Sequence, residues 1–248
     1  MITLRAPAKV TRYLEVTGRR ADGLHELRSE MVTVDLADAL DVDEHADYLR
    51  VRDAGGAVPE DETNLVARAL RLVARRAGVT VRKAIPVGGG LGGGSADAAA
   101  ILRWAGGVSA ERALTLGSDV PFCQVGGRAL VEGVGERVTS LAFERRDLTL
   151  ILAPFGVDTR ACYAAYDEMR AERWSPRGSN HLEEPAARVE PRLAELREWL
   201  RAEWGVPVHL AGSGSTLFVD GRVSDAPSSS LISPVGSLRI LVTSTTSA

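Results

Sequence analysis

The sequence predicts an α+β fold with two lobes. Segments with strand character and segments with helical character are interspersed, without the regular βαβ alternation of a parallel α/β sheet. An apolar strand at residues 148–153 is placed to open a second half. The 248 residues are enough for one large domain or two small ones, with a buried hydrophobic core.

The composition is that of a globular protein. Apolar residues make up 45% and charged residues 25%, which excludes a disordered chain. No apolar run reaches the roughly 18–20 residues of a membrane helix, and no signal peptide is visible, so we expect no membrane partner. Two cysteines cannot form a disulfide scaffold or a four-ligand zinc site, which predicts a reduced, cytoplasmic setting. The net charge of −3 argues against a nucleic-acid partner.

The first part of the chain predicts strands and turns. Residues 2–52 mix β-branched, aromatic and polar residues, with a turn signal at 18–23 and a strand at 27–34. The glycines at 55–56, followed by Pro59, predict a loop that ends this stretch.

A helix and a short strand come next. Apolar residues at helical spacing predict a helix over 65–77, with Thr63 as its N-cap and Gly78 at the C′ position. A strand is expected over 80–85, and Pro86 ends it.

The rest of the chain alternates between helices, turns and short strands. Helices are expected over 95–102, 159–169 and 191–204. Strands are expected over 129–132, 148–153, 208–211, 217–219 and 238–243. Turns or loops are expected over 117–122, 172–179, 212–216 and 224–234.

A glycine-rich loop lies between the strand at 80–85 and the helix at 95–102. Residues 86–94 are Pro-Val-Gly-Gly-Gly-Leu-Gly-Gly-Gly, and Ser95 follows at the expected N-cap. Glycines let backbone N–H groups approach an anion, and a helix N-terminus offers free donors and partial positive charge. The pattern predicts a phosphate-binding loop. A flexible linker fits less well because an apolar strand and an alanine-rich helix flank the loop.

Two common phosphate-binding motifs do not describe this loop. A P-loop requires a lysine after its last glycine, and none follows here. Gly88, Gly90 and Gly93 match the dinucleotide fingerprint, but no strand precedes Glu111, where the ribose-binding carboxylate is expected. A dinucleotide oxidoreductase is therefore the least favoured interpretation.

Lysine is rare in this chain. Of the 30 basic residues, only Lys9 and Lys83 are lysines. A compact ammonium differs from a guanidinium in geometry and hydration, so these two positions are candidates for a specific role. The alternative is a composition bias in favour of arginine that leaves two ordinary lysines.

Residues 86–98, Pro-Val-Gly-Gly-Gly-Leu-Gly-Gly-Gly-Ser-Ala-Asp-Ala, resemble the nucleotide-binding motif of the GHMP kinases. The further motifs that resemble this family, in the expected order, are Ala-Pro-Ala-Lys-Val (6–10), Gly-Arg-Arg-Ala-Asp-Gly-Leu-His-Glu-Leu (18–27), Asn-Leu-Val (64–66), Gly-Ser-Asp-Val-Pro-Phe (117–122) and Gly-Ser-Gly-Ser-Thr (212–216). The resemblance covers nearly the whole chain, from about residue 5 to residue 219.

The resemblance implies a two-lobed fold and a kinase activity. Residues 1–145 would form the N-terminal ATP-binding lobe, related to ribosomal protein S5 domain 2, and residues 146–248 a ferredoxin-like C-terminal lobe. The implied reaction is ATP-dependent phosphorylation of the 2-hydroxyl of a cytidine diphosphate-linked methylerythritol, in the non-mevalonate route to isoprenoid precursors. ATP and Mg²⁺ are the implied cofactors, and a monomer or homodimer is expected.

The resemblance also assigns roles to residues. Asp119 matches the aspartate that accepts the hydroxyl proton, and Lys9 the lysine that stabilises negative charge. The residues implied in nucleotide binding are Pro86, Val87, Gly88, Gly89, Gly90, Leu91, Gly92, Gly93, Gly94, Ser95, Ala96, Asn64, Leu65 and Lys83. Those implied in substrate binding are Thr11, Leu24, His25, Thr159 and Tyr163. The resemblance does not identify the Mg²⁺ ligands, and the Ser95 hydroxyl is the one candidate for such a ligand.

Several of these residues also have a structural interpretation. Asp119 alone fits a turn carboxylate, His25 a surface histidine and Lys83 a solvated lysine at a sheet edge. Tyr163 fits either stacking on a base or plain core packing. Ser215 and Thr216, in the turn at 212–216, fit either a closure over the site or a simple turn.

The chain departs from the family pattern at three places. Thr11 stands where asparagine is expected, and Leu24 where an aromatic residue, usually tyrosine, would stack on cytosine. The stretch at 105–117 and the region after Val219 are shorter than expected, so the last helix of the second lobe is expected to be stunted or absent. These departures keep two alternatives open: a kinase for another small alcohol, such as homoserine or a sugar, and a nucleotide-binding pseudokinase.

Overall fold

The computed structural model describes residues 1–53, 58–223 and 229–247, so the predicted loop at 55–56 lies outside the described residues. The strands are β1 (Ile2–Arg19), β2 (His25–Asp43), β3 (Tyr48–Arg52), β4 (Gly78–Arg82), β5 (Arg128–Gly133), β6 (Arg137–Ser140), β7 (Asp147–Leu152), β8 (His209–Leu210), β9 (Leu217–Asp220), β10 (Ser230–Ser233) and β11 (Gly236–Ser244). The helices are α1 (Leu65–Leu72), α2 (Gly93–Trp104), α3 (Ala110–Leu114), α4 (Val120–Val125), α5 (Thr159–Ala171), α6 (Glu183–Val189) and α7 (Arg192–Trp204).

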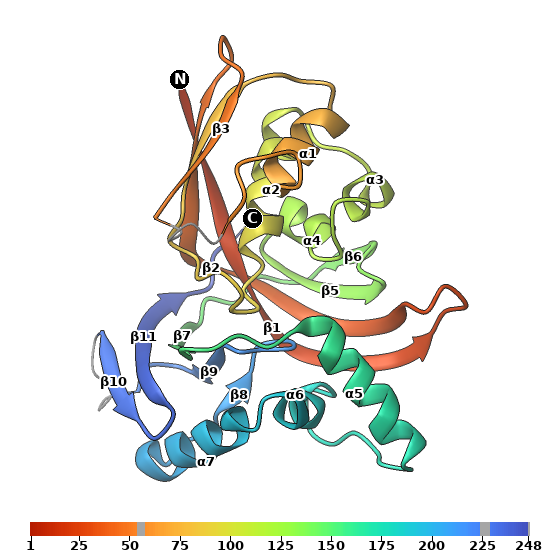
Figure 1. The fold of residues 1–248 in the computed structure, drawn as a ribbon, viewed down its shortest axis with the longest axis vertical. Helices are drawn as coiled ribbons and strands as arrows, with labels where there is room; N and C mark the ends of the chain where they lie inside the picture. The colour runs from red at the N-terminus through yellow and green to blue at the C-terminus, as the bar shows by residue number, and fades with distance from the viewer. Residues whose placement is uncertain (54–57, 224–228, 248) are drawn as a thin grey trace.

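The fold is α+β with two sheets, as predicted (Figure 1). The first sheet has the order β3-β4-β2-β5-β6, with β1 paired along β2, and helices α1 to α4 lie beside it. The second sheet has the order β10-β11-β7-β9-β8, with all pairs antiparallel, and helices α5 to α7 lie beside it.

Strands β1 and β2 form a long antiparallel hairpin that runs from one core into the other. Ala6, Ala8 and Val10 of β1 are fully buried in the first core, because alternate residues of a strand face the same side. Further along the same strand, Leu14 belongs to the second core. The turn predicted at 18–23 closes the hairpin.

Helix α2 is the central helix of the first lobe. Every residue from Ala96 to Leu102 is buried, which suits a run of small and apolar side chains packed between α1, α4 and β1. The helix begins at Gly93, and Gly92 takes the N-cap position with a φ of 70°, so the expectation that Ser95 is the N-cap was wrong. Ser95 lies in the first turn instead, and no side chain caps the helix.

The second sheet is buried on both faces at its centre. Leu148, Leu150 and Leu152 of β7 point into the first core, and Ile151 points into the second. Leucines of α7, such as Leu196 and Leu200, pack in this second core. Strand β7 therefore belongs to both cores.

The second lobe follows the ferredoxin-like β-α-β-β-α-β succession up to β9. Where the second helix would come, the described residues form β10 instead, which pairs with β11. Among the described residues that follow β9 there is no helix, and residues 224–228 lie outside the described residues, so the expected shortening or loss of this helix stays a prediction. The loop predicted over 224–234 was wrong at Ser230–Ser233, where edge pairing overrides a Ser-rich composition; residues 224–228 lie outside the described residues.

The predicted ends of the first helix needed correction. Asn64, and not Thr63, is the N-cap of α1, because its side chain accepts a hydrogen bond from Val66 N at 2.8 Å. The helix stops at Leu72 and not near residue 77. Gly78 begins β4 and is not a C′ residue.

Several short elements were not predicted. Val120–Val125 is helical, so the turn expected over 117–122 covers only the approach to α4. Helices α3 and α6 and strand β6 were missed because segments this short show little periodicity, and β3 lies within the stretch at 2–52 predicted to hold strands and turns. No helix within the described residues is long and apolar enough to cross a membrane.

Candidate active site

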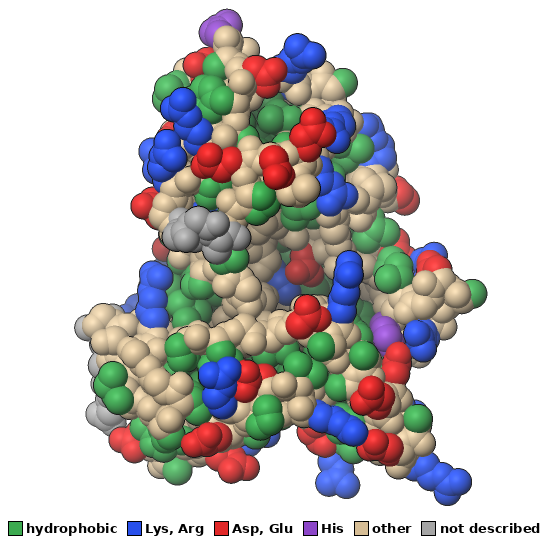
Figure 2. Space-filling view, in the orientation of Figure 1, with side chains coloured by type: hydrophobic (Ala, Val, Ile, Leu, Met, Phe, Trp, Pro, Cys, Tyr) green, Lys and Arg blue, Asp and Glu red, His purple; other side chains and the backbone are tan. Residues whose placement is uncertain are grey.

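A central cavity of about 370 Å³ lies between the two lobes. Figure 2 shows this face hollowed between the upper and lower halves, with acidic and basic side chains visible inside the hollow. Strand β1, the glycine loop, the segment before α4 and the turn at 212–213 contribute its walls. The site is thus built from segments far apart in sequence.

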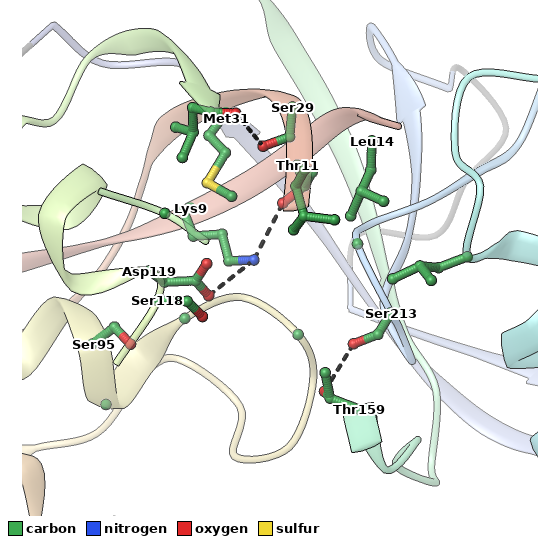
Figure 3. A pocket seen from close by; sticks show the side chains of 18 of the residues that line it. Lys9, Thr11, Leu14, Ser29, Met31, Ser95, Ser118, Asp119, Thr159 and Ser213 are labelled. Carbon is green, nitrogen blue, oxygen red and sulfur yellow. Dashed lines mark hydrogen bonds and ion pairs between the residues drawn. The ribbon is translucent and has the colours of Figure 1, made fainter. Parts of the chain in front are cut away.

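Lys9 and Asp119 meet in this cavity (Figure 3). Lys9 Nζ lies 3.2 Å from Asp119 Oδ2 and donates a hydrogen bond to Thr11 Oγ1, also at 3.2 Å. The Lys9 side chain is only 7% exposed and that of Asp119 27%, so the ion pair is shielded while the carboxylate still reaches the cavity. Ser118 lies beside Asp119 on the same wall.

The backbone explains how Lys9 reaches this place. Lys9 N donates to Leu91 O at 3.0 Å, so β1 is hydrogen-bonded to the glycine loop. The loop is also held from the second lobe, because Thr216 Oγ1 donates to Gly89 O at 2.5 Å. Thr216 therefore holds the glycine loop through a hydrogen bond, whereas Ser215 does not contact the loop through its hydroxyl, which donates to the carbonyl of Phe155.

The glycine loop ends at the uncapped N-terminus of α2. Because no side chain caps this helix, the first N–H groups of α2 lack intrahelical partners and are available to an anion. Ser95, in this first turn, lines the central cavity. This arrangement has the chemistry of the phosphate-binding loop that the sequence predicts.

Gly92 is the glycine whose substitution we expect to disturb Lys9. Gly88 and Gly92 both have left-handed φ values, 75° and 70°, so alanine is strained at either position. A Cβ at position 92 would lie 2.8 Å from Lys9 Cγ, whereas a Cβ at position 88 would meet nothing within 4 Å. We expect Gly92→Ala to lower kcat by at least about tenfold relative to Gly88→Ala, measured by steady-state kinetics. Equal kcat values in the two variants would contradict this role.

A second cavity, of about 240 Å³ and here called the loop cavity, lies on the other side of the glycine loop. The predicted nucleotide-binding residues that line it are Asn64, Leu65, Lys83, Pro86, Val87, Gly88, Gly89, Gly90, Leu91, Gly92, Gly93 and Gly94. Ser95 faces the central cavity instead, and Ala96 is buried inside α2. The predicted set is therefore brought together around one loop, with Ala96 as the exception.

Lys83 is not the solvated edge lysine of the alternative interpretation, because its side chain is 6% exposed. Its Nζ donates to Asp38 Oδ2 at 2.5 Å and to Asp97 Oδ2 at 2.8 Å. Asp38 Oδ1 also accepts from Ala84 N at 2.6 Å and Ile85 N at 2.8 Å, just before the glycine loop. Burial raises the pKa of Asp97 to about 7, against the lowering effect of the Lys83 ammonium.

Sequence reasoning missed both carboxylates of this buried cluster. Asp97 is an acidic residue within an alanine-rich helix, which is the one local signal that could have marked it. Asp38 lies on β2 and comes to Lys83 only through the pairing of β2 with β4. The pattern of a single strand does not reveal such a partner.

A third cavity of about 530 Å³, here called the outer cavity, lies next to the turn of the β1–β2 hairpin. Leu24, His25 and Tyr163 line it. His25 stacks on Tyr163 with ring centroids 4.7 Å apart, and its Nε2 lies 2.8 Å from Asp167 Oδ1. The His25 side chain is 9% exposed, so it is not a free surface histidine, whereas Leu24 is 53% exposed.

The substrate-binding residues predicted from the resemblance therefore divide between two cavities. Thr11, Thr159 and Tyr163 line the central cavity, and Thr159 Oγ1 lies 2.9 Å from Ser213 Oγ. Tyr163 lines both cavities, so it packs against His25 and still presents a face to a ligand. No group of three or more potential metal ligands occurs among the residues that the structure describes.

Neither Cys123 nor Cys162 is among the residues that line the central cavity. Cys123, in α4, is buried, and burial raises the pKa of its thiol to about 12. The hydroxyls, the buried ammonium and the carboxylate are the groups that a ligand would meet in the central cavity.

Comparison with known proteins gives the same family from sequence and from structure. The model of the GHMP kinases N terminal domain matches residues 64–127. The chain is 34% identical to the 4-diphosphocytidyl-2-C-methyl-D-erythritol kinase of Bacillus subtilis (strain 168), over 86% of each chain. It is 37% identical to the kinase of the same name from Pelotomaculum thermopropionicum (strain DSM 13744 / JCM 10971 / SI), over 88% of each chain.

Solved structures agree. A crystal structure of 4-(cytidine 5'-diphospho)-2C-methyl-D-erythritol kinase is 33% identical and aligns over 100% of both chains with a TM-score of 0.73. A putative homoserine kinase from Listeria monocytogenes, 19% identical, aligns over 88% of this chain and 86% of its own with a TM-score of 0.53. The latter likeness shows the fold alone.

Proposed function

Because the chain belongs to the 4-diphosphocytidyl-2-C-methyl-D-erythritol kinases of the GHMP kinase family, we propose that its three cavities hold the substrates of that reaction. The protein is an ATP-dependent kinase of the non-mevalonate route to isoprenoid precursors. It phosphorylates the 2-hydroxyl of 4-diphosphocytidyl-2-C-methyl-D-erythritol. The Lys9–Asp119 pair beside an uncapped helix N-terminus is the observation that carries this proposal.

In this proposal, the glycine loop and α2 bind the phosphates of ATP. Glycines at the start of α2 line both the central cavity and the loop cavity, and Ser95 lines the central one, so the free N–H groups there would meet the phosphates. The loop cavity, bordered by Asn64, Leu65 and Val87, would take the rest of the nucleotide. Phosphoryl transfer needs mainly positioning and charge stabilisation, and the hydrogen bonds from Lys9 N and Thr216 Oγ1 to the loop would contribute to positioning.

Asp119 is proposed to accept the proton of the acceptor hydroxyl. A carboxylate is a weak base, but it suffices when the proton leaves late in a loose transition state. Lys9, whose Nζ lies 3.2 Å from Asp119 Oδ2, is proposed to stabilise the charge that develops on the transferred group. Thr11, Thr159 and Ser213 border the same space and would orient the erythritol hydroxyls.

The proposal includes Mg²⁺ with ATP. Mg²⁺ usually keeps several waters and takes only one or two protein ligands besides the phosphates, so few protein ligands are needed here. Ser95, which lines the central cavity with Asp119, is the residue that we propose to contact it. When bound, the ion would neutralise phosphate charge.

A kinase for homoserine or a sugar is less consistent with the outer cavity. That cavity adds about 530 Å³, lined by His25 and Tyr163, and a small alcohol would leave it unused. Because Leu24 stands in place of an aromatic residue, a base in this cavity would stack on Tyr163 alone and would not be held between two rings.

The assay of this function compares two acceptors. Purified protein with Mg-ATP is expected to release ADP with 4-diphosphocytidyl-2-C-methyl-D-erythritol, and not with unsubstituted 2-C-methyl-D-erythritol. Equal ADP release with both would shift the assignment to another alcohol. ATP binding without ADP release for either would favour a nucleotide-binding pseudokinase.

We further propose a boundary between the two lobes, a cellular location and an oligomeric state. The lobe boundary is placed between residues 145 and 146, supported by the separate sheets of β1 to β6 and β7 to β11. The two free cysteines support a cytoplasmic location and the net charge of −3 supports the lack of a nucleic-acid partner, and the proposed oligomeric state is a monomer or a homodimer.

A further inference from the structure

Among the residues that the structure describes, the outer cavity is lined by one arginine, Arg160, whose charge is not offset by a carboxylate. The charged residues that line it, apart from His25, are Arg19, Arg160 and Asp167. Both carboxylate oxygens of Asp167 already have partners, because Oδ1 lies 2.8 Å from His25 Nε2 and Oδ2 lies 3.2 Å from Arg19 Nη1. Arg160 has no ion pair or hydrogen bond through its side chain within the described residues. The cavity wall is therefore suited to an anion.

Arg160 lies where the outer cavity joins the central one. It is in the first turn of α5, between Thr159, which lines the central cavity, and Tyr163, which lines both. Both cavities share further wall residues: Leu27, Ser118 and Val134. A ligand with a base beside Tyr163 and a hydroxyl beside Asp119 must pass this shared wall.

The N-terminus of α5 does not by itself supply the positive charge. Asp158 caps this helix, accepting from Ala161 N at 2.7 Å, and its carboxylate offsets the helix dipole there. The Arg160 side chain is thus the distinctive positive group. It is exposed, so it can turn toward a ligand without breaking an existing contact.

We propose that Arg160 binds the diphosphate that links the cytidine and erythritol parts of the substrate. This inference rests on the proposed function, which supplies the nucleotide-linked acceptor. A guanidinium binds phosphate oxygens through two parallel hydrogen bonds, a geometry that an ammonium cannot match. Leu24 and Arg160 line the same cavity, so a base and a diphosphate held there would belong to one ligand.

The test measures binding of substrate fragments by calorimetry. We expect Arg160→Ala to weaken CDP binding about fivefold to tenfold, as for a partly exposed charge-assisted contact, with cytidine binding unchanged. The CDP affinity of Arg160→Lys should fall between those of the wild-type protein and Arg160→Ala. In Arg160→Ala, the KM for the acceptor should rise with little change in kcat. Arg177→Ala, which removes another exposed arginine outside the three cavities, is the matched control.

Two results would overturn the inference, and they are distinguishable. If Arg160→Ala binds CDP as tightly as the wild-type protein, the role of Arg160 alone is refuted. If the wild-type protein binds neither CDP nor cytidine, the proposed function fails and the role of Arg160 fails with it. An equal loss in Arg177→Ala would show a general charge effect and would also refute a specific contact.

Discussion

Asp119→Asn is expected to lower kcat by about 10²- to 10⁴-fold while ATP binding stays intact. The amide keeps an oxygen that can accept from Lys9 Nζ, now 3.2 Å from Oδ2, so the local structure should persist. What is lost is the negative charge that accepts the hydroxyl proton. Steady-state kinetics measure the turnover, and calorimetric titration with a non-hydrolysable ATP analogue measures the binding.

Asp158→Asn is the matched control for this variant. Asp158 caps α5, and asparagine is an equally good N-cap, so stability and turnover should both be retained. Full activity in Asp119→Asn would remove Asp119 from the mechanism. Loss of ATP binding together with turnover would instead indicate that Asp119 holds the site together.

Lys83→Met is expected to lower the free energy of unfolding by about 3–5 kcal/mol. The substitution leaves the carboxylates of Asp38 and Asp97 buried near one another without their shared cation. Desolvation already raises the pKa of Asp97, and the Lys83 ammonium lowers it. Removal of the ammonium should therefore raise the pKa of Asp97 further. Urea denaturation followed by circular dichroism measures the change.

Two further variants make this experiment decisive. Arg82 neighbours Lys83 and pairs with Asp41, but its side chain is 50% exposed. Arg82→Met should therefore lower the free energy of unfolding by no more than about 1 kcal/mol. Adding Asp97→Asn to Lys83→Met should recover part of the stability, because one uncompensated charge is removed. Equal losses for Lys83→Met and Arg82→Met would show that the buried cluster contributes no more than a surface pair.

The parts of the fold with strong local signals could be predicted from the sequence. The glycine loop followed by an apolar helix was recognised because glycine and alanine have opposite conformational preferences. The start of α2 was misplaced by assuming that Ser95 caps it. Gly92 can adopt the left-handed conformation that this N-cap has, and a serine there would be strained.

Contacts between distant segments could not be predicted from local patterns. The pairing of Lys9 with Asp119 was expected only from the resemblance, because no periodicity links β1 to the segment before α4. Asp38 was missed for the same reason. The strand β10 was missed because its partner β11, and not its own composition, stabilises it.

Strand β7 has a mechanical consequence for the whole enzyme. Its side chains anchor both hydrophobic cores, and the β1–β2 hairpin passes through both as well. Separation of the lobes like the halves of a hinge would therefore expose core leucines to water. Residues buried on both sides of the boundary thus tie the two lobes together, and any large opening between them would carry a cost in apolar surface exposed to water.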